Sequence, residues 1–288
     1  MGWVRRLLFA AALLPALQGH GEPRTLAVPP QATDARLGAD EAPHTVVYDP
    51  AVAEPLLVWL PGTNGRADAT HKALFQAVRD AGFRLVSLSY LDDVAVSQVC
   101  KGPRLRTYPG CAADFRQQRS WGNAARSPIA DRPEDAIVPR LTQLLRHLAA
   151  QQPDGEWAGY LAGDEPRWSR IVLAGQSQGA GMAAFIAKTR AVGGVLMFSG
   201  GWDKDARGEP ARWYRQPSAT PPQRWQVTYN VREPAADLLA DVYTALGIPP
   251  ANIHALDLPV VARQPHGDGI ANPAYAPLWR EMLQAVRP

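Results

Sequence analysis

The hydrophobic positions of this chain fall into short continuous apolar runs that alternate with longer segments of helical periodicity. A continuous apolar run of a few residues is typical of a strand buried on both faces of a sheet. Such runs, with one alternating segment, predict strands over residues 45–48, 56–60, 83–90, 171–174, 194–200, 225–231 and 253–258. Helical patterns cover residues 67–81, 133–151, 235–246 and 276–286, and the stretch after residue 177 through Phe185 and Ile186. This alternation predicts the α/β class, with one doubly wound, mostly parallel sheet and helices on both faces.

The first 21 residues have a pattern unlike the rest of the chain. Arg5 and Arg6 precede an apolar stretch over residues 7–17, and small polar residues follow it. A charged start, a short apolar centre and a small-residue exit are typical of a secretory signal peptide, and this centre is too short to span a bilayer. Residues 1–21 are therefore predicted to be a signal peptide, 22–43 an extended N-terminal arm, and 44–288 a single domain.

Export changes what the charge of the chain implies. The expected location is the periplasm or the medium outside the cell. Loss of Arg5 and Arg6 with the leader lowers the formal net charge from +3 to +1, so an isoelectric point near 9.0 is no argument for a nucleic-acid partner. With 46% hydrophobic and 20% charged residues, the composition is that of an ordinary globular protein, and no integral membrane association is expected.

Residues 91–132 interrupt the alternation and show no clear helix or strand. A stretch of this length inside a compact domain is usually functional, so an irregular insertion that caps the site is expected. It contains Cys100 and Cys111, the only cysteines, which in an exported chain predict a local disulfide. Two free buried thiols are the alternative, and zinc is disfavoured because no histidine is near either cysteine in sequence.

The same insertion is strongly basic. Between Cys100 and Arg132, seven basic side chains stand against two acidic ones. One hypothesis is that these arginines shape access to the site and favour anionic or polymeric substrates through their field. The other is a solvated surface loop whose arginines are paired locally.

The candidate chemistry centres on the Gly-Gln-Ser-Gln-Gly stretch over residues 175–179, which follows a predicted strand and precedes a predicted helix. In that context Gly-x-Ser-x-Gly is a nucleophile elbow, in which the serine is held in a strained conformation at a sharp turn. Glycines flank the serine because a side chain would collide across the turn. The helix N-terminus presents free N–H groups to developing negative charge. Ser177 is the predicted nucleophile; the alternative is an ordinary serine in a glycine-rich turn.

A serine nucleophile needs a base, and the base needs a third group to orient it. Two histidines follow Ser177 in the chain. His254 lies inside a predicted strand, whereas His266 lies in a flexible loop after the last strand, from which an imidazole can reach across the carboxyl edge of the sheet. His266 is therefore the predicted base. Glu233 follows the strand over 225–231 by two residues and is the predicted acid, with Asp203, just past the preceding strand, as its rival.

An oxyanion hole needs two backbone N–H donors directed at one point. One is the N–H of Gln178, directly after the nucleophile. The second is expected from the turn after the strand over 56–60, at Thr63 or its neighbour Asn64. A plain strand-exit turn is the alternative for these residues.

Side chains near strand ends are candidates for the wall of a substrate pocket. Trp202 is the first of these, and Asn64 is also predicted to contact the substrate. Trp59, Tyr90 and Trp121 are weaker candidates, because such aromatics more often belong to a core. No metal and no organic cofactor is implied by these residues.

These motifs resemble the α/β-hydrolase superfamily over most of the chain that follows the leader. The order serine, acid, histidine is the order of that family, and Leu-Pro-Gly-Thr-Asn-Gly over 60–65 resembles its oxyanion turn. The elbow resembles that of cutinases and related esterases. The chain is longer than a cutinase, has one cysteine pair before the elbow, and separates Glu233 from His266 by 33 positions, so the closer resemblance is to exported bacterial α/β hydrolases.

The resemblance implies an exported serine hydrolase, a carboxylic ester hydrolase that acts on a small-molecule or polymeric ester through an acyl-enzyme. Amidases, thioesterases and polyester or lipid hydrolases are alternatives with the same mechanism. A catalytically silent hydrolase fold that serves as a binding protein is the alternative of a different class.

Overall fold

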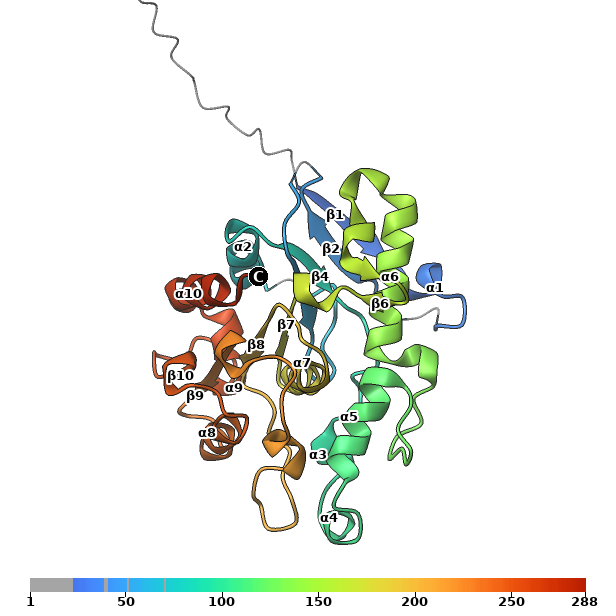
Figure 1. Cartoon of the computed structure of the whole chain (residues 1–288). Coiled ribbons are helices and arrows are strands. Elements are labelled where there is room, and N and C mark those ends of the chain that lie inside the picture. Colours follow the sequence, from blue (N-terminus) through green and yellow to red (C-terminus); the bar gives the residue numbers. More distant parts are fainter. Residues whose placement is uncertain (1–22, 39–40, 51, 70) are drawn as a thin grey trace, which may run out of the picture.

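A computed structural model describes residues 23–38, 41–50, 52–69 and 71–288. The predicted signal peptide, residues 1–21, lies outside the described residues. The centre of the molecule is an eight-stranded sheet in the order β1-β2-β4-β3-β7-β8-β9-β10 (Figure 1). Its strands are β1 (Arg24–Val28), β2 (His44–Tyr48), β3 (Leu56–Leu60), β4 (Arg84–Ser87), β7 (Ile171–Gln176), β8 (Gly194–Phe198), β9 (Trp225–Asn230) and β10 (Ile253–Leu256).

Strand β2 is antiparallel to both of its neighbours, and every other neighbouring pair in this sheet is parallel. The predicted mostly parallel α/β class is therefore confirmed. Along β3, Leu56, Val58 and Leu60 pack into the core on one face of the sheet. Leu57 and Trp59 pack into the core on the other face. Burial on both faces explains why the apolar run is continuous instead of alternating.

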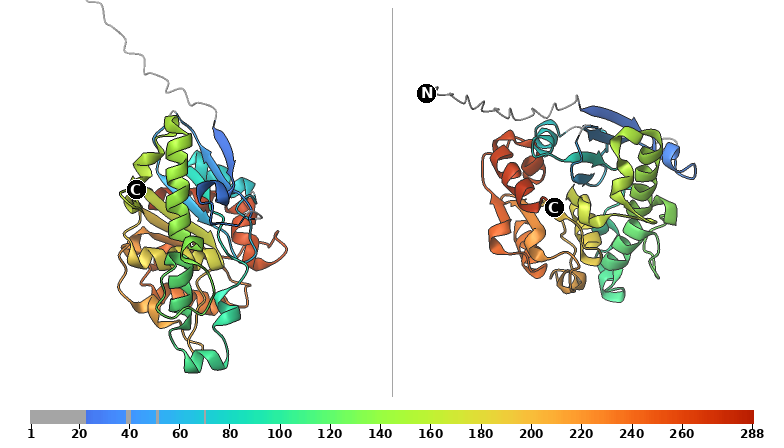
Figure 2. Two further views of the ribbon diagram at one scale, coloured as in Figure 1. Left: turned by 90° about the vertical axis from the view of Figure 1, so that its right-hand side faces the viewer. Right: turned by 45° about the horizontal axis from the view of Figure 1, so that its top comes forward.

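Helices cover both faces of the sheet. One face is covered by α2 (Lys72–Asp80), α9 (Pro265–Ala271) and α10 (Ala276–Val286), and the other by α6 (Ile137–Gln151), α7 (Gln178–Thr189) and α8 (Ala236–Ala245). Figures 1 and 2 show α10, in red, and α6, in yellow-green, on opposite sides of the molecule. Within the described ranges, none of the helices combines the length and the apolar character needed to span a bilayer.

Short elements complete the connections between these helices and strands. The segment over 153–169 includes a small hairpin of β5 (Leu161–Ala162) and β6 (Glu165–Pro166). Single 3₁₀ turns lie at Pro133–Asp135, Pro153–Gly155, Trp157–Tyr160, Trp168–Arg170, Arg212–Arg215, Pro222–Arg224, Pro250–Asn252 and Pro273–Tyr275.

The segment expected as an N-terminal arm contains a strand of the sheet and a short helix, α1 (Pro30–Thr33). Strand β1 pairs antiparallel with β2, with Leu26 opposite Val46. Of the residues in β1, Val28 alone is fully buried. An edge strand with so little burial leaves no periodic hydrophobic pattern in the sequence, so its pairing depends on the backbone of β2.

The insertion over residues 91–132 contains three helices, which corrects the prediction of a wholly irregular segment. It contains α3 (Val96–Val99), α4 (Pro103–Thr107) and α5 (Cys111–Trp121). The buried face of α5 carries Arg116 and Arg119 beside Ala112 and Phe115. Charged residues at core-facing positions remove the apolar period by which a helix is recognised.

The two buried arginines of α5 are neutralised by acids outside the helix. Arg116 Nε lies 2.5 Å from Asp203 Oδ2 and its Nη2 lies 2.7 Å from Asp203 Oδ1. Arg119 Nε lies 2.7 Å from Asp131 Oδ2. Because an unpaired buried charge is very unfavourable, each bidentate pair requires α5 to dock in one orientation.

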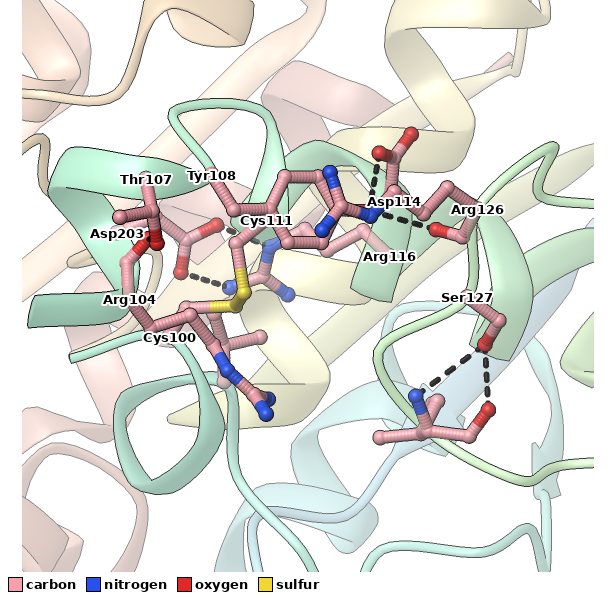
Figure 3. The surroundings of a disulfide bond; sticks show 12 residues. Cys100, Arg104, Thr107, Tyr108, Cys111, Asp114, Arg116, Arg126, Ser127 and Asp203 are labelled. Atoms are coloured by element: carbon pink, nitrogen blue, oxygen red, sulfur yellow. Dashed lines mark hydrogen bonds and ion pairs between the residues drawn. A yellow bond between two sulfur atoms is a disulfide. The ribbon is translucent and has the colours of Figure 1, made fainter.

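Cys100 and Cys111 form the predicted disulfide, drawn in Figure 3. Cys100 directly follows α3 and Cys111 is the first residue of α5, so the bond closes the α4 segment into a loop. Both cysteines are buried. The disulfide therefore links the short α3 segment to the helix that the ion pairs hold against the core.

Replacing both cysteines, as in Cys100→Ser/Cys111→Ser, is expected to lower the free energy of unfolding by about 3 kcal/mol, because the unfolded chain regains the freedom of a short closed loop. Urea unfolding followed by tryptophan fluorescence measures this difference. Wild-type protein with its disulfide reduced is the control and should unfold at the midpoint of the variant. Equal midpoints for oxidised wild type and variant would show that the disulfide does not contribute to stability.

Candidate functional site

Ser177 lies at the sharp turn between β7 and α7. Its backbone has φ 55° and ψ −118°, a region that non-glycine residues rarely adopt. Its N–H donates a hydrogen bond to the Phe198 carbonyl at 2.9 Å, which links the turn to the end of β8. The strained geometry is the one that the nucleophile-elbow motif predicts.

The glycines of the elbow are required by close backbone contacts. A Cβ on Gly179 would lie 2.0 Å from the carbonyl oxygen of Leu60, at the end of β3. A Cβ on Gly175 would lie 2.5 Å from the carbonyl carbon of Gly179. Neither distance is compatible with a side chain, so helix α7 approaches the sheet as closely as it does only with glycine at both positions.

A cavity of about 340 Å³ opens beside Ser177. Five of the residues predicted for the site line it: Thr63, Ser177, Gln178, Trp202 and His266. The insertion forms another part of its wall, through residues 95–98 at α3 and through Arg116 of α5. The Val96 N–H donates to Gln178 Oε1 at 3.2 Å, so α3 is bonded directly to the first residue of α7.

Asn64 does not line this cavity. Its side chain is exposed, its φ is 56°, and its N–H donates to the Asp92 carbonyl at 3.1 Å. The expectation that Asn64 contacts the substrate therefore has no support from the geometry, because the turn directs this residue to solvent. Thr63 is the member of the pair that lies at the cavity.

His266 is the second residue of the short helix α9, and not part of a flexible loop as expected. Its Nδ1 lies 2.7 Å from Glu233 Oε2. The ring of Trp202 stacks on the imidazole, with the ring centroids 4.9 Å apart and the planes inclined by 21°. A helix start, a carboxylate and an indole therefore restrict how the imidazole can rotate.

Glu233 is buried in the turn after β9 and accepts hydrogen bonds from three donors. Besides His266, they are the Ser199 hydroxyl at 2.5 Å and the Asn230 N–H at 2.9 Å, both bonded to Oε1. Burial by itself would raise the pKa of Glu233, but hydrogen bonds from His266, Ser199 and Asn230 outweigh it and lower the pKa below its ordinary value. The carboxyl group is therefore ionised at neutral pH.

The rival residues are engaged elsewhere. Both carboxylate oxygens of Asp203 accept from Arg116, and Oδ2 also accepts from the Trp213 indole at 3.0 Å. His254 lies in β10 with its Nε2 2.8 Å from Gln226 Oε1. The geometry thus joins Glu233 to His266 and leaves Asp203 as the anchor of α5.

The second ring nitrogen of His266, Nε2, contacts the side chain of Gln176. His266 Nε2 lies 3.0 Å from Gln176 Nε2, and the same amide nitrogen donates to the His266 carbonyl at 3.3 Å. Over the described residues, no hydrogen bond joins the Ser177 hydroxyl to His266. The serine and the imidazole thus share one cavity wall without being bonded to each other.

The other aromatic candidates do not belong to the cavity. Trp59 is buried in the core beside α2, Tyr90 donates its hydroxyl to the Pro61 carbonyl at 2.6 Å, and Trp121 packs against Trp168. Trp202 is the aromatic residue of the predicted set that lines the site. A position at or after the end of a predicted strand was the signal that selected Trp202, and Tyr90 shared that signal.

The geometry adds three residues that the sequence reasoning did not select. Gln176 is inside the elbow motif, Ser199 directly follows β8, and Arg116 was one of several arginines in the insertion. Ser199 could have been selected by the same signal as Glu233, because both follow closely after a strand of the parallel sheet. Of the arginines considered for substrate attraction, Arg104 and Arg106 are exposed and outside the cavity wall, and Arg116 is neutralised by Asp203.

The site shows no sign of a metal centre in the described part of the chain. Within those residues, no group of three or more histidine, cysteine, aspartate or glutamate side chains is arranged to hold a metal ion. The functional groups that meet at the cavity are a hydroxyl, an imidazole bonded to a carboxylate, and backbone N–H groups at the start of α7. This set can transfer an acyl group through a serine.

Comparisons with known proteins find similar structures but no match by sequence. No family model and no curated protein matches the chain. Similar solved structures include a dienelactone hydrolase from Anabaena variabilis ATCC 29413, which is 16% identical to this chain. The match covers 93% of this chain and 100% of that one, with a TM-score of 0.49. A truncated carbohydrate esterase from gut microbiota is 13% identical, with 94% and 99% coverage and a TM-score of 0.49. The carboxylesterase EstE1 from a metagenomic library is 14% identical, with 95% and 92% coverage and a TM-score of 0.48.

The fold follows from the topology itself. A mostly parallel sheet with one antiparallel strand near its edge carries a serine at the tight turn from a central strand into a helix. A glycine-containing turn after the neighbouring strand β3 reaches the same cavity. The chain has the α/β-hydrolase fold.

Proposed function

We propose that the protein is a serine hydrolase that cleaves carboxylic esters, with Ser177 as nucleophile, His266 as base and Glu233 as the group that orients His266. The observation that carries the proposal is the hydrogen bond between His266 and the buried Glu233, at the cavity that Ser177 lines. The chain order of the three residues, serine before acid before histidine, is the order used on this fold.

In the first step the Ser177 Oγ attacks the ester carbonyl carbon while His266 Nε2 takes the hydroxyl proton. The carbonyl electron pair moves onto oxygen, and the N–H groups of Gln178 and Thr63 are proposed to bind this oxyanion. The Glu233 carboxylate keeps the proton of the neutral imidazole on Nδ1 and offsets the positive charge of the imidazolium that forms.

In the second step the tetrahedral intermediate collapses and the bond to the alcohol oxygen breaks. The alcohol leaves with the proton from His266 Nε2, and Ser177 keeps the acyl group as an ester. Water then attacks the acyl-enzyme with His266 again as base, which releases the acid and restores the Ser177 hydroxyl. No atom or electron is needed beyond substrate and water.

A small ester is the proposed substrate. The cavity of about 340 Å³ falls in the lower part of the range for sites that bind small molecules. Rates with matched amides, thioesters and polyesters separate the remaining substrate classes. We also propose that the protein is exported, because the N-terminal residues have the signal-peptide pattern and the Cys100–Cys111 disulfide suits an oxidising compartment.

A fluorophosphonate probe tests the nucleophile. The wild type should be labelled covalently at Ser177, and Ser177→Ala should remain unlabelled and lose activity on p-nitrophenyl esters. Mass spectrometry of the labelled peptide measures the site of reaction. A folded wild type that takes up no probe would refute the hydrolase proposal and favour the catalytically silent binding protein.

Glu233→Gln is expected to lower kcat by about 10⁴-fold, as when the acid of a serine-protease triad is replaced by its amide. Asp203→Asn is the matched comparison, because Asp203 accepts from Arg116 and not from His266. It should lower the free energy of unfolding by about 3 kcal/mol, since Arg116 is left without its counter-charge, while kcat stays within about 10-fold of wild type. The reverse assignment of the two effects would make Asp203 the functional acid.

Ser199→Ala is expected to lower stability in a pH-dependent way. Because the folded-state pKa of Glu233 is below its ordinary value of 4.5, this group contributes stability that is present above that value and is lost as the pH falls through the folded pKa. Loss of the Ser199 hydroxyl raises the folded-state pKa of Glu233. The free energy of unfolding of the variant should therefore be lower than that of the wild type by about 1–2 kcal/mol at pH 7, and by less at pH 3. Urea unfolding at both pH values measures it; a pH-independent deficit would contradict the role of Ser199 as a donor to the carboxylate.

A further inference from the structure

Gln176 is the last residue of β7 and directly precedes Ser177. Its side chain is half-buried and lines the same cavity. Its amide nitrogen lies 3.0 Å from His266 Nε2 and 3.3 Å from the His266 carbonyl oxygen. One side-chain amide therefore contacts both the ring and the backbone of the histidine, on the side of the ring opposite to Glu233.

The partner groups decide which atom donates in the Gln176–His266 contact. Glu233 is ionised and can only accept, so His266 Nδ1 carries the proton in the bond to Glu233. A neutral imidazole has one N–H, and its Nε2 is then a lone pair. The Gln176 amide must donate to that lone pair, and its second bond, to the His266 carbonyl, also requires the NH₂ group to face the histidine.

The lone pair that Gln176 occupies is the one that the proposed mechanism needs. His266 Nε2 has to take the proton of Ser177, yet over the described residues the Ser177 hydroxyl is not bonded to it. The other end of the amide is confined as well, because a Cβ on Gly62 would lie 2.4 Å from Gln176 Oε1. The amide thus lies between the turn that carries Thr63 and the imidazole.

We propose that Gln176 is a positioning residue that holds His266 in a resting arrangement and releases Nε2 to Ser177 when a substrate carbonyl enters the cavity. The inference rests on the proposed hydrolase function. An amide N–H directed at Nε2 stabilises the neutral imidazole, and it opposes the imidazolium because two donors would then face each other. The bond therefore works against proton transfer from Ser177 until it breaks.

The charged groups that contact His266, line its cavity or belong to α9 do not change when Gln176 is replaced. Glu233 approaches from the turn after β9, and Asp203 lines the cavity after β8 but is paired with Arg116 of α5. Within α9 itself, the Asp268 carboxylate is occupied by the N–H groups of Val261 and Ala262. A change in pH dependence on replacing Gln176 therefore reports on its amide.

Gln176→Leu tests the inference, because leucine fills similar space without a donor. The acidic limb of the kcat/KM profile of the free enzyme should move to higher pH by about 0.5–1 unit, the shift expected when one hydrogen bond to the neutral base is lost. Gln176→Glu should move the limb further in the same direction, because a carboxylate favours the imidazolium. A purely structural role would lower the rate at every pH and leave the limb in place.

Gln226→Leu is the matched control. Gln226 also pairs its amide with a histidine, since Gln226 Oε1 lies 2.8 Å from His254 Nε2, but neither residue lines the cavity. This variant should keep the wild-type pH profile. If it shifts the limb as Gln176→Leu does, the effect is not specific to the elbow and the inference is overturned.

Labelling by the fluorophosphonate probe separates failure of this inference from failure of the proposed function. If the wild type is labelled at Ser177 and the limb does not move in either folded Gln176 variant, the positioning role is wrong and the hydrolase function stands. If the wild type is not labelled, both are wrong. If Gln176→Leu does not fold, Gln176→Met, which also fills similar space without a donor, decides by the presence or absence of the shift.

Discussion

The contact between the first turn of α7 and the end of β3 controls the geometry above the sheet. There is no space for a Cβ on Gly179 because the Leu60 carbonyl lies where it would be. This close approach directs the start of α7 at the same cavity as the turn after β3, which holds Thr63. It also leaves Ser177 at positive φ, a strain of about 1–3 kcal/mol that surrounding structure must offset. β3 and β7, buried almost throughout, provide that support.

The carboxyl ends of four parallel strands supply the groups around the imidazole. From β7 to β10 the spatial order in the sheet is also the chain order. Gln176 ends β7, Ser199 follows β8, Glu233 follows β9, and His266 begins the helix after β10. Neighbouring strands therefore bring neighbouring members of the site together, and each needs only a short turn to reach the cavity. The arrangement lets Glu233 and Gln176 contact opposite nitrogens of one ring.

The insertion contributes to the same cavity by a different physical means. Its helix α5 has no apolar stripe, and bidentate pairs of Arg116 and Arg119 with acids outside the helix anchor it. Buried pairs of this kind contribute little net stability, but breaking one costs several kcal/mol, so they specify orientation. The disulfide then connects α5 to α3, whose residues form part of the cavity wall. Since Asp203 neutralises Arg116, the basic insertion does not place a net positive charge at the cavity through this arginine.

The sequence alone was sufficient to predict a structural feature wherever the interaction that decides it is local or depends only on burial. Apolar runs predicted the central strands because both of their faces are covered, and the elbow was predicted because its glycines are needed within a few residues of Ser177. Tertiary structure decided the pairing of β1, the helical state of α5 and the exposure of Asn64. It also decided that Glu233, and not Asp203, is the partner of His266. The position of the Gln176 amide on His266 Nε2 was also decided there. Each of these depends on a partner that only the folded chain brings within bonding distance, such as Asp203 for Arg116 or Glu233 for His266, and no local pattern encodes it.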